Sequence, residues 1–156
     1  MSSRRNFIRK TAMGLAGSAV LPLVGRSSAA APEAAAVHPV TTGIAGYTFA
    51  KFDIDQSIAM MKRVGVTNLS VKDIHLPLNS SDEKIRSVTG KLRDAGINIY
   101  TVGVIYMRTK EAVDQAFQYA RKVGVNMIVG VPNYDLLDYA EAQVKAHDIR
   151  LAIHNH

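Results

Sequence analysis

Four segments of the chain repeat one pattern, in which a helix-like stretch with basic residues at its end is followed by glycine and then by apolar, mostly β-branched residues. The glycines are Gly65, Gly96 and Gly124, and Asp148 stands at the equivalent place in the fourth copy. Successive copies are 31, 28 and 24 residues apart, which is typical of one strand–helix unit. A left-handed glycine ends a helix, and Lys or Arg in the last turn suits the negative end of the helix dipole. The repeat therefore predicts alternating helices and strands.

Apolar spacing places these elements along the chain. Before each repeat position, apolar residues recur every three or four places and form a single stripe, which indicates helices around 54–61, 85–92, 113–120 and 137–144. After each repeat position comes a short apolar run, and these runs predict strands at Val66–Val71, Ile97–Val104, Val125–Val131 and Ile149–Ile153, preceded by a first strand at Gly43–Phe49. Such apolar strands are typical of a parallel sheet that is covered on both faces.

Strands that alternate with helices define an α/β fold, for which two architectures fit: a doubly wound open sheet and a (β/α)8 barrel. Tyr47 to Phe52 follow the first strand where a dinucleotide-binding fold has a glycine-rich phosphate loop, so the barrel is favoured. A barrel needs eight units and roughly 250 residues. We therefore expect the N-terminal half of a (β/α)8 TIM barrel, with five parallel strands and four helices, from a longer reading frame. The alternative is a complete five-stranded, flavodoxin-like domain, which normally ends in a helix that covers the last strand.

The amino-acid composition excludes several kinds of chemistry and partner. The chain has no cysteine, which excludes disulfides, iron–sulfur clusters and thiol nucleophiles. The net charge of +6 arises mostly in the first 40 residues, which hold five basic residues and one acidic residue, whereas the remainder holds 14 basic and 12 acidic residues. No cluster of Lys and Arg with interleaved aromatic residues occurs after residue 40, so we expect no nucleic-acid partner.

The first 36 residues have the organisation of an export signal. Arg4 and Arg5 are followed by Asn-Phe-Ile, the apolar run Thr11–Val24 and a stretch of small residues, and this order resembles a twin-arginine signal peptide. The alternative, an uncleaved membrane anchor, is disfavoured because the apolar run is shorter than the about 20 residues that span a bilayer. We expect a signal at 1–36, a linker at 37–42 and the partial barrel at 43–156. Export by the twin-arginine machinery would place the mature protein in the periplasm without a stable membrane anchor.

The predicted site lies at the carboxyl ends of the strands, because these ends converge on one edge of a parallel α/β fold. The candidates for binding a substrate are Tyr47, Phe49, Lys72, His75, Tyr106, Asn133, Asn155 and His156. The catalytic candidates are His75 and His154. His154 and His156 lie two residues apart on an extended segment, so their imidazoles point to the same side and are also candidate metal ligands. Alternative roles stay open: a loop contact for His75, packing for Phe49 and Tyr106, and a turn for Asn133.

Four motifs together resemble a known superfamily. They are Gly43–Phe49 at the first strand, Lys72–Leu78 (KDIHLPL) after the second, Val129–Asn133 (VGVPN) at the fourth and Ile153–His156 (IHNH) at the fifth. In this order they are similar to the xylose-isomerase-like TIM barrels, the superfamily of sugar phosphate isomerases and epimerases, and specifically to its exported twin-arginine members. The resemblance covers about residues 41–156.

The resemblance implies a sugar isomerase or epimerase that uses a divalent cation, either Mn, Mg, Co or Zn. In such an enzyme the cation holds two substrate oxygens while a base removes the proton next to a carbonyl, which gives an enediolate. Many members carry a metal-binding Glu, followed by Asn-His, at the position of His154 in this chain. The Asn155–His156 pair matches that pattern. His75, His154 or His156 would orient sugar hydroxyls, Lys72 would steady negative charge, and Tyr47, Phe49 and Tyr106 would form an apolar wall.

Three other functions fit the same residues. The first is a lyase or dehydratase that acts on a keto-sugar or cyclitol through the same enediolate. The second is a periplasmic sugar-binding barrel without catalysis, which the replacement of the acidic residue by His154 would explain. The third is an inert truncated fragment. Half a barrel leaves two unpaired strand edges and uncovered apolar surface, so a homo-oligomer is also open.

Overall fold

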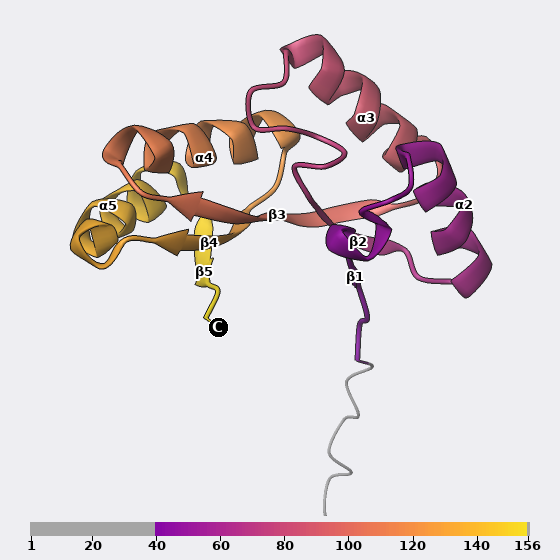
Figure 1. Cartoon of the computed structure of the whole chain (residues 1–156), viewed down its shortest axis with the longest axis horizontal. Coiled ribbons are helices and arrows are strands. Elements are labelled where there is room, and N and C mark those ends of the chain that lie inside the picture. The colour runs from indigo at the N-terminus through magenta and orange to yellow at the C-terminus, as the bar shows by residue number, and fades with distance from the viewer. Residues whose placement is uncertain (1–39, 156) are drawn as a thin grey trace, which may run out of the picture. The chain divides into compact units, whose positions relative to one another are not determined.

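The computed structural model describes residues 40–155, and Figure 1 shows strands and helices alternating along this part of the chain. The elements are β1 (Ile44–Ala45), η1 (Gly46–Phe49), α2 (Ile54–Val64), β2 (Asn68–Val71), α3 (Asp82–Asp94), β3 (Asn98–Met107), α4 (Lys110–Val123), β4 (Met127–Pro132), η2 (Tyr134–Leu136), α5 (Leu137–His147) and β5 (Arg150–Ile153). The η elements are short 3-10 helices. The predicted five strands and four α-helices are confirmed.

All five strands belong to one sheet and pair in parallel with their neighbours in the sequence. Their order is β1-β2-β3-β4-β5, with no reversal. A doubly wound sheet reverses its strand order at a switch point and carries helices on both faces. Here the helices lie along one side of the curved sheet (Figure 1). The described residues therefore have the arrangement of a barrel segment and not that of a flavodoxin-like domain.

Local sequence signals set the helix ends. Asp53 begins α2 with a reciprocal capping box, in which its side chain accepts from the backbone N–H of Gln56 at 2.8 Å and the Gln56 side chain accepts from the Asp53 N–H at 3.0 Å. Gly65 and Gly124 end α2 and α4 in the left-handed conformation, at φ 70° and 83°. Asp148 ends α5 in the same way at φ 52°, so the fourth copy of the repeat keeps the geometry without the glycine.

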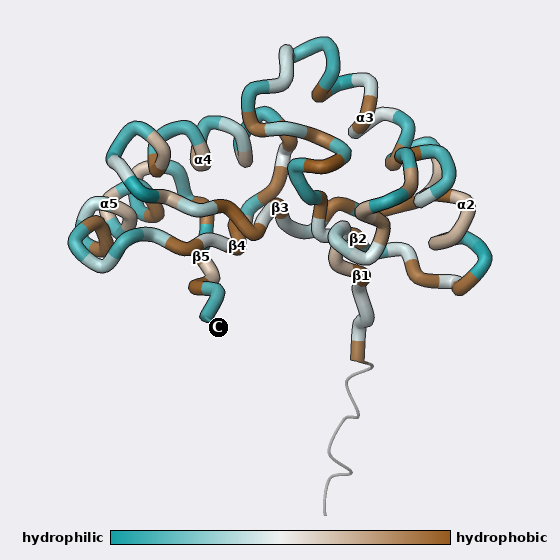
Figure 2. Tube along the Cα trace, in the orientation of Figure 1, coloured by the Kyte–Doolittle hydropathy of each residue, from teal (hydrophilic) through white to brown (hydrophobic). Residues whose placement is uncertain are grey.

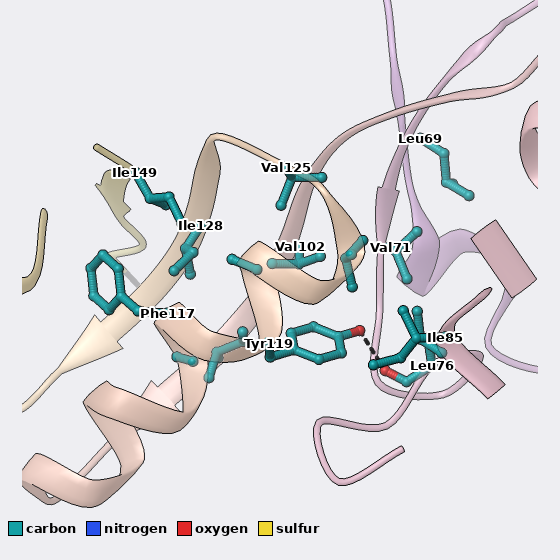
Figure 3. Packing of buried hydrophobic residues seen from close by; sticks show 14 of the residues in the cluster. Leu69, Val71, Leu76, Ile85, Val102, Phe117, Tyr119, Val125, Ile128 and Ile149 are labelled. Carbon is teal, nitrogen blue, oxygen red and sulfur yellow. Dashed lines mark hydrogen bonds between the residues drawn. The ribbon is translucent and has the colours of Figure 1, made fainter. Parts of the chain in front are cut away.

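The hydrophobic core fills the space between the helices and the sheet. Its largest fully buried side chains include Phe117, Met61 and Leu76, and Figure 3 shows Phe117 of α4 beside Ile128 of β4. Figure 2 shows hydrophobic segments along β3 and β4, whereas the outer turns of the helices are largely hydrophilic. On the other side of the sheet, Tyr47 and Tyr106 remain exposed. We expected both faces of the sheet to be covered. Among the residues described, only the face that packs against the helices is covered.

Two predicted strand boundaries are wrong. The first strand ends at Ala45, and Gly46–Phe49 turns into η1, where the Tyr47 carbonyl accepts from the Ala50 N–H at 3.1 Å. Gly46 permits this turn close to β2, since a Cβ on it would lie 2.7 Å from the Ser70 carbonyl oxygen. The third strand continues to Met107, three residues further than predicted, so Tyr106 lies within β3 and not after it.

The predicted export signal and half of the predicted linker, residues 1–39, lie outside the described residues, as does His156. The predicted boundaries of those segments stay predictions. Within residues 40–155, no helix has both the length and the apolar character needed to cross a membrane.

Candidate functional site

A cavity of about 670 Å³ lies on the side of the sheet that faces away from the helices, here called the open side. It collects residues from β1 to β4, from η1 and from the segments that follow β2 and β5. The residues that line it are Ala45, Tyr47, Ser70, Lys72, Tyr100, Gly103, Val104, Tyr106, Val129 and His154. Four of the predicted site residues, Tyr47, Lys72, Tyr106 and His154, are thus brought together from segments as much as 107 residues apart in the sequence. None of the described residues that line the cavity carries a carboxylate.

The ammonium group of Lys72 is held in a defined position at the cavity wall. Its Nζ donates to the Val104 carbonyl oxygen at 3.0 Å and lies 3.1 Å from Oδ1 of Asp73. The Lys72 side chain is 18% exposed, whereas that of Asp73 is 54% exposed and does not line the cavity. An ion pair with one partner in water contributes little to stability, at most about 1 kcal/mol. The cavity therefore has a positively charged wall whose counter-charge lies largely in solvent.

His154 enters the cavity from the segment that follows β5. Its backbone N–H donates to the Gly130 carbonyl oxygen at 3.0 Å, which continues the β4–β5 ladder by one residue beyond the strand. Its side chain is half-buried. This ladder bond positions the imidazole at the rim of the sheet, as predicted for a residue at a strand end.

Phe49 and His75 lie outside the cavity. Phe49 is 4% exposed and belongs to the hydrophobic core. His75 lies in the loop after β2, where its Nε2 is 2.8 Å from the Phe52 carbonyl oxygen and 3.4 Å from Oγ of Ser57. Because the carbonyl can only accept, Nε2 carries the proton and donates. The geometry favours the alternative role of His75, a side chain that ties its loop to the segment before α2.

Asn133 and Asn155 are exposed and do not line the cavity. The Asn133 side chain donates to the Arg108 carbonyl oxygen at 3.2 Å, and its backbone N–H donates to that of Met107 at 2.9 Å. These bonds join the loops that follow β3 and β4, which is the turn role considered for Asn133. His156, the second candidate metal ligand, lies outside the described residues.

Sequence reasoning missed Tyr100 and Ser70, which line the cavity from within β3 and β2. The prediction considered only residues at the carboxyl ends of the strands, so it left both of them out. Strict alternation from Tyr106 back to Tyr100 would have included Tyr100, but it would also have placed Val102 in the cavity, and Val102 is fully buried in the core. The register shift between Gly103 and Ile105 breaks the alternation. A Cβ on Gly103 would overlap the Val129 carbonyl oxygen, so glycine is required at this close approach.

The loop that carries Lys72 and His75 is fastened to α4 by Tyr119. The Tyr119 hydroxyl donates to the Leu76 carbonyl oxygen at 2.7 Å inside the core, as Figure 3 shows. Burial raises the pKa of Tyr119 above its ordinary value, and the negative charge of Asp73 raises that pKa further. The hydroxyl thus stays protonated and keeps its donor. A buried residue of α4 that does not line the cavity therefore holds the loop backbone four residues after the lysine.

The described residues do not fit a metal centre by themselves. Within residues 40–155, no three His, Asp or Glu side chains come together in a way that would hold an ion. His154 is the one histidine on the cavity wall in this part of the chain. Zinc, manganese and cobalt sites need three or more such ligands. A cation at this cavity would need ligands other than the residues described.

A second hollow, of about 660 Å³, lies at the opposite edge of the sheet, where the strands begin and the helices end. Amide side chains follow this edge: Asn98 donates to Asn68 at 3.0 Å, and Arg150 donates to Asn126 at 3.4 Å. These contacts join neighbouring strand starts. In barrels of this type the chemistry lies at the other edge, and this one serves stability.

Comparison with known proteins supports the fold. No protein-family model matches the chain, and no curated protein matches it. Among solved structures, an uncharacterized protein from Parabacteroides distasonis matches with a TM-score of 0.66 and 25% identity over 73% of this chain and 52% of that chain. A sugar phosphate isomerase/epimerase from the same organism matches with a TM-score of 0.55 and 13% identity over 80% and 54%.

A xylose isomerase domain protein from Alicyclobacillus acidocaldarius matches with a TM-score of 0.52 and 10% identity over 71% of this chain and 48% of that chain. The chain thus spans about half the length of the structures it matches. Its five parallel strands and four helices are an α/β fold that corresponds to the N-terminal half of a TIM-barrel-like fold, the fold of the sugar phosphate isomerase/epimerase and of the xylose isomerase domain protein that it matches.

Proposed function

We propose that this chain forms part of a sugar isomerase or epimerase and that the cavity on the open side of the sheet holds the sugar. One observation carries the proposal: Lys72, Tyr106 and His154 line a single cavity on a sheet whose fold is that of xylose-isomerase-like proteins. Chemistry in such folds takes place at the carboxyl ends of the strands, which is where Lys72 and His154 stand.

The reaction proposed begins with the removal of a proton from the carbon next to a carbonyl group. His154 is the base in this proposal, because an imidazole is a common general base and this one is half-buried on the cavity wall. His75 is not chosen, because it does not line the cavity. Loss of this proton leaves an enediolate, which carries negative charge. The ammonium group of Lys72 at the cavity wall would stabilise that charge. Return of the proton to the same carbon from the other face gives the epimer. Its return to the former carbonyl carbon, together with transfer of the hydroxyl proton between the two enediolate oxygens, gives the isomer.

The cavity offers a surface suited to a sugar. Tyr47, Tyr100 and Tyr106 present both an apolar ring and a hydroxyl, and the Ser70 hydroxyl adds a further donor and acceptor. Rings cover the C–H faces of a pyranose or furanose, while hydroxyls exchange hydrogen bonds with its rim. About 670 Å³ lies within the usual range for small-molecule sites.

The test uses NMR in D2O with a panel of aldoses, ketoses and keto-sugars. We expect deuterium at the carbon next to the carbonyl together with a new isomer or epimer. We expect His154→Gln to lower the exchange rate by about 10²–10⁴-fold. His147→Gln, a histidine on α5 at the other edge of the sheet, is the matched control and retains the rate. An unsaturated product would instead identify the lyase chemistry. Sugar binding without exchange would identify a binding protein, and the absence of both would refute the proposal.

We also propose that the chain is exported by the twin-arginine route, as Arg4 and Arg5 with the apolar run after them indicate. Cell fractionation tests this. The wild-type chain should be found in the periplasm, and replacement of both arginines by lysine should retain it in the cytoplasm. Periplasmic accumulation of the double-lysine variant would contradict the route.

A further inference from the structure

We infer that the site prefers a sugar that carries a carboxylate and that Lys72 binds this carboxylate. The inference rests on the proposed function for the sugar itself and goes beyond it in naming an acidic sugar as the substrate class. It starts from the charges at the cavity: the described residues that line it include one lysine, no arginine and no carboxylate. A neutral sugar has no charge that could balance the largely buried ammonium group of Lys72, whereas the carboxylate of an acidic sugar could balance it.

The geometry leaves Lys72 able to bind such a group. An ammonium group has three N–H donors, of which the Val104 carbonyl and the Asp73 carboxylate take two. Both acceptors hold Nζ in place at the wall. The third donor is available to an oxygen in the cavity, and a charge-assisted hydrogen bond there is stronger than a neutral one.

Asp73 competes with a bound carboxylate for the charge of Lys72, but it does so from outside the cavity. It does not line the cavity, and more than half of its side chain is in contact with solvent. Water screens its attraction for Lys72, whereas a carboxylate inside the cavity would meet the ammonium in a drier setting. We therefore expect Asp73 to weaken anion binding without abolishing it.

A carboxylate fits this wall better than a phosphate. A phosphate group carries close to two negative charges and three strong acceptor oxygens, and proteins usually meet it with several cations or a row of backbone N–H groups. The cavity offers a single ammonium with one donor to spare, together with hydroxyls. One negative charge matches one positive charge.

The experiment measures binding of matched sugar pairs by calorimetry, with the full chain at low ionic strength. The pairs are glucose with glucuronate and galactose with galacturonate, and glucose 6-phosphate is the phosphate arm. We expect at least one uronate to bind about tenfold or more tightly than its neutral partner, which corresponds to one charge-assisted hydrogen bond. The preference should shrink as salt is added.

Two variants test the residue. Lys72→Met should bring the ratio of uronate to neutral-sugar affinity to about one, whereas Asp73→Asn should raise that ratio, because a competing charge is lost. Lys91→Met is the matched control, since Lys91 also pairs with a carboxylate, at Asp55, but lies on α3 outside the cavity. Circular dichroism checks that each variant folds. Should Lys72→Met fail to fold, Asp73→Asn tests the inference with Lys72 intact.

The outcomes separate the inference from the proposed function. Equal affinity for uronates and neutral sugars would overturn the inference and leave the proposed function standing. A preference that persists in Lys72→Met, a ratio that does not rise in Asp73→Asn, or tighter binding of glucose 6-phosphate than of glucuronate would also overturn it. If no sugar of either kind bound, the proposed function itself would fail.

Discussion

The hydrogen bond from Tyr119 to the Leu76 carbonyl allows a sharp test of how the loop beside the cavity is held. Tyr119 is 3% exposed, Leu76 is fully buried, and the two oxygens lie 2.7 Å apart. Tyr119→Phe keeps the ring and removes only the donor. The Leu76 carbonyl then stays in the core without that partner, which costs about 1–3 kcal/mol of the free energy of unfolding.

The assay is urea denaturation followed by circular dichroism, with Tyr134→Phe as the matched control. Tyr134 is 91% exposed, so the same change there should stay within about 0.5 kcal/mol of the wild type. A second readout is the pH dependence of stability. Because burial raises the pKa of Tyr119, the folded chain binds the phenolic proton more tightly than the unfolded chain does. The stability is therefore fully present below about pH 10 and falls as the pH rises above it.

Tyr119→Phe should remove the part of this alkaline loss that Tyr119 causes, whereas Tyr134→Phe should retain the full loss. The reasoning is refuted if Tyr119→Phe matches Tyr134→Phe in stability at neutral pH, or if both variants lose stability equally above pH 10. Either result would mean that the hydroxyl does not hold the loop in the folded protein.

Three further substitutions test the caps of two helices and one glycine within a third helix, each by the same denaturation assay. Asp53→Ala removes the capping box of α2 and should cost about 1 kcal/mol; no loss would show that the cap is replaced by water. Gly90→Ala should add about 0.5–1 kcal/mol, since the nearest atom to the new Cβ would be Nη2 of Arg93 at 4.0 Å; a loss would reveal crowding on α3. Asp148→Gly should add up to about 1 kcal/mol by relieving a left-handed aspartate at φ 52°, and a decrease would contradict the repeat.

The order of strands and helices could be predicted because local signals specify each unit. The repeat positions Gly65, Gly124 and Asp148 all have positive φ where the pattern expected helix ends. Apolar periodicity located all four helices and the four later strands. These signals act over a few residues, so neither folding partners nor register is needed to recognise them.

The site was predicted in part for the same reason. The rule that strand ends converge placed Tyr47, Lys72 and His154 together, and they do share a cavity. The rule could not separate them from His75 and Asn133, which lie beside the same strand ends but bond to backbone carbonyls of neighbouring loops. Which way a loop side chain turns depends on the acceptors that other segments bring to it.

The sequence alone thus determined the strand–helix repeat, the helix ends and the edge of the sheet where polar residues gather. Only the tertiary structure decided that Gly46 turns the chain after two residues of β1, that register shifts in β3 leave Val102 in the core while Tyr100 and Tyr106 line the cavity, and that Tyr119 reaches Leu76 across 43 residues. The physical reason is that side-chain direction on a strand follows register, and register is set by pairing with neighbouring strands rather than by the residue itself.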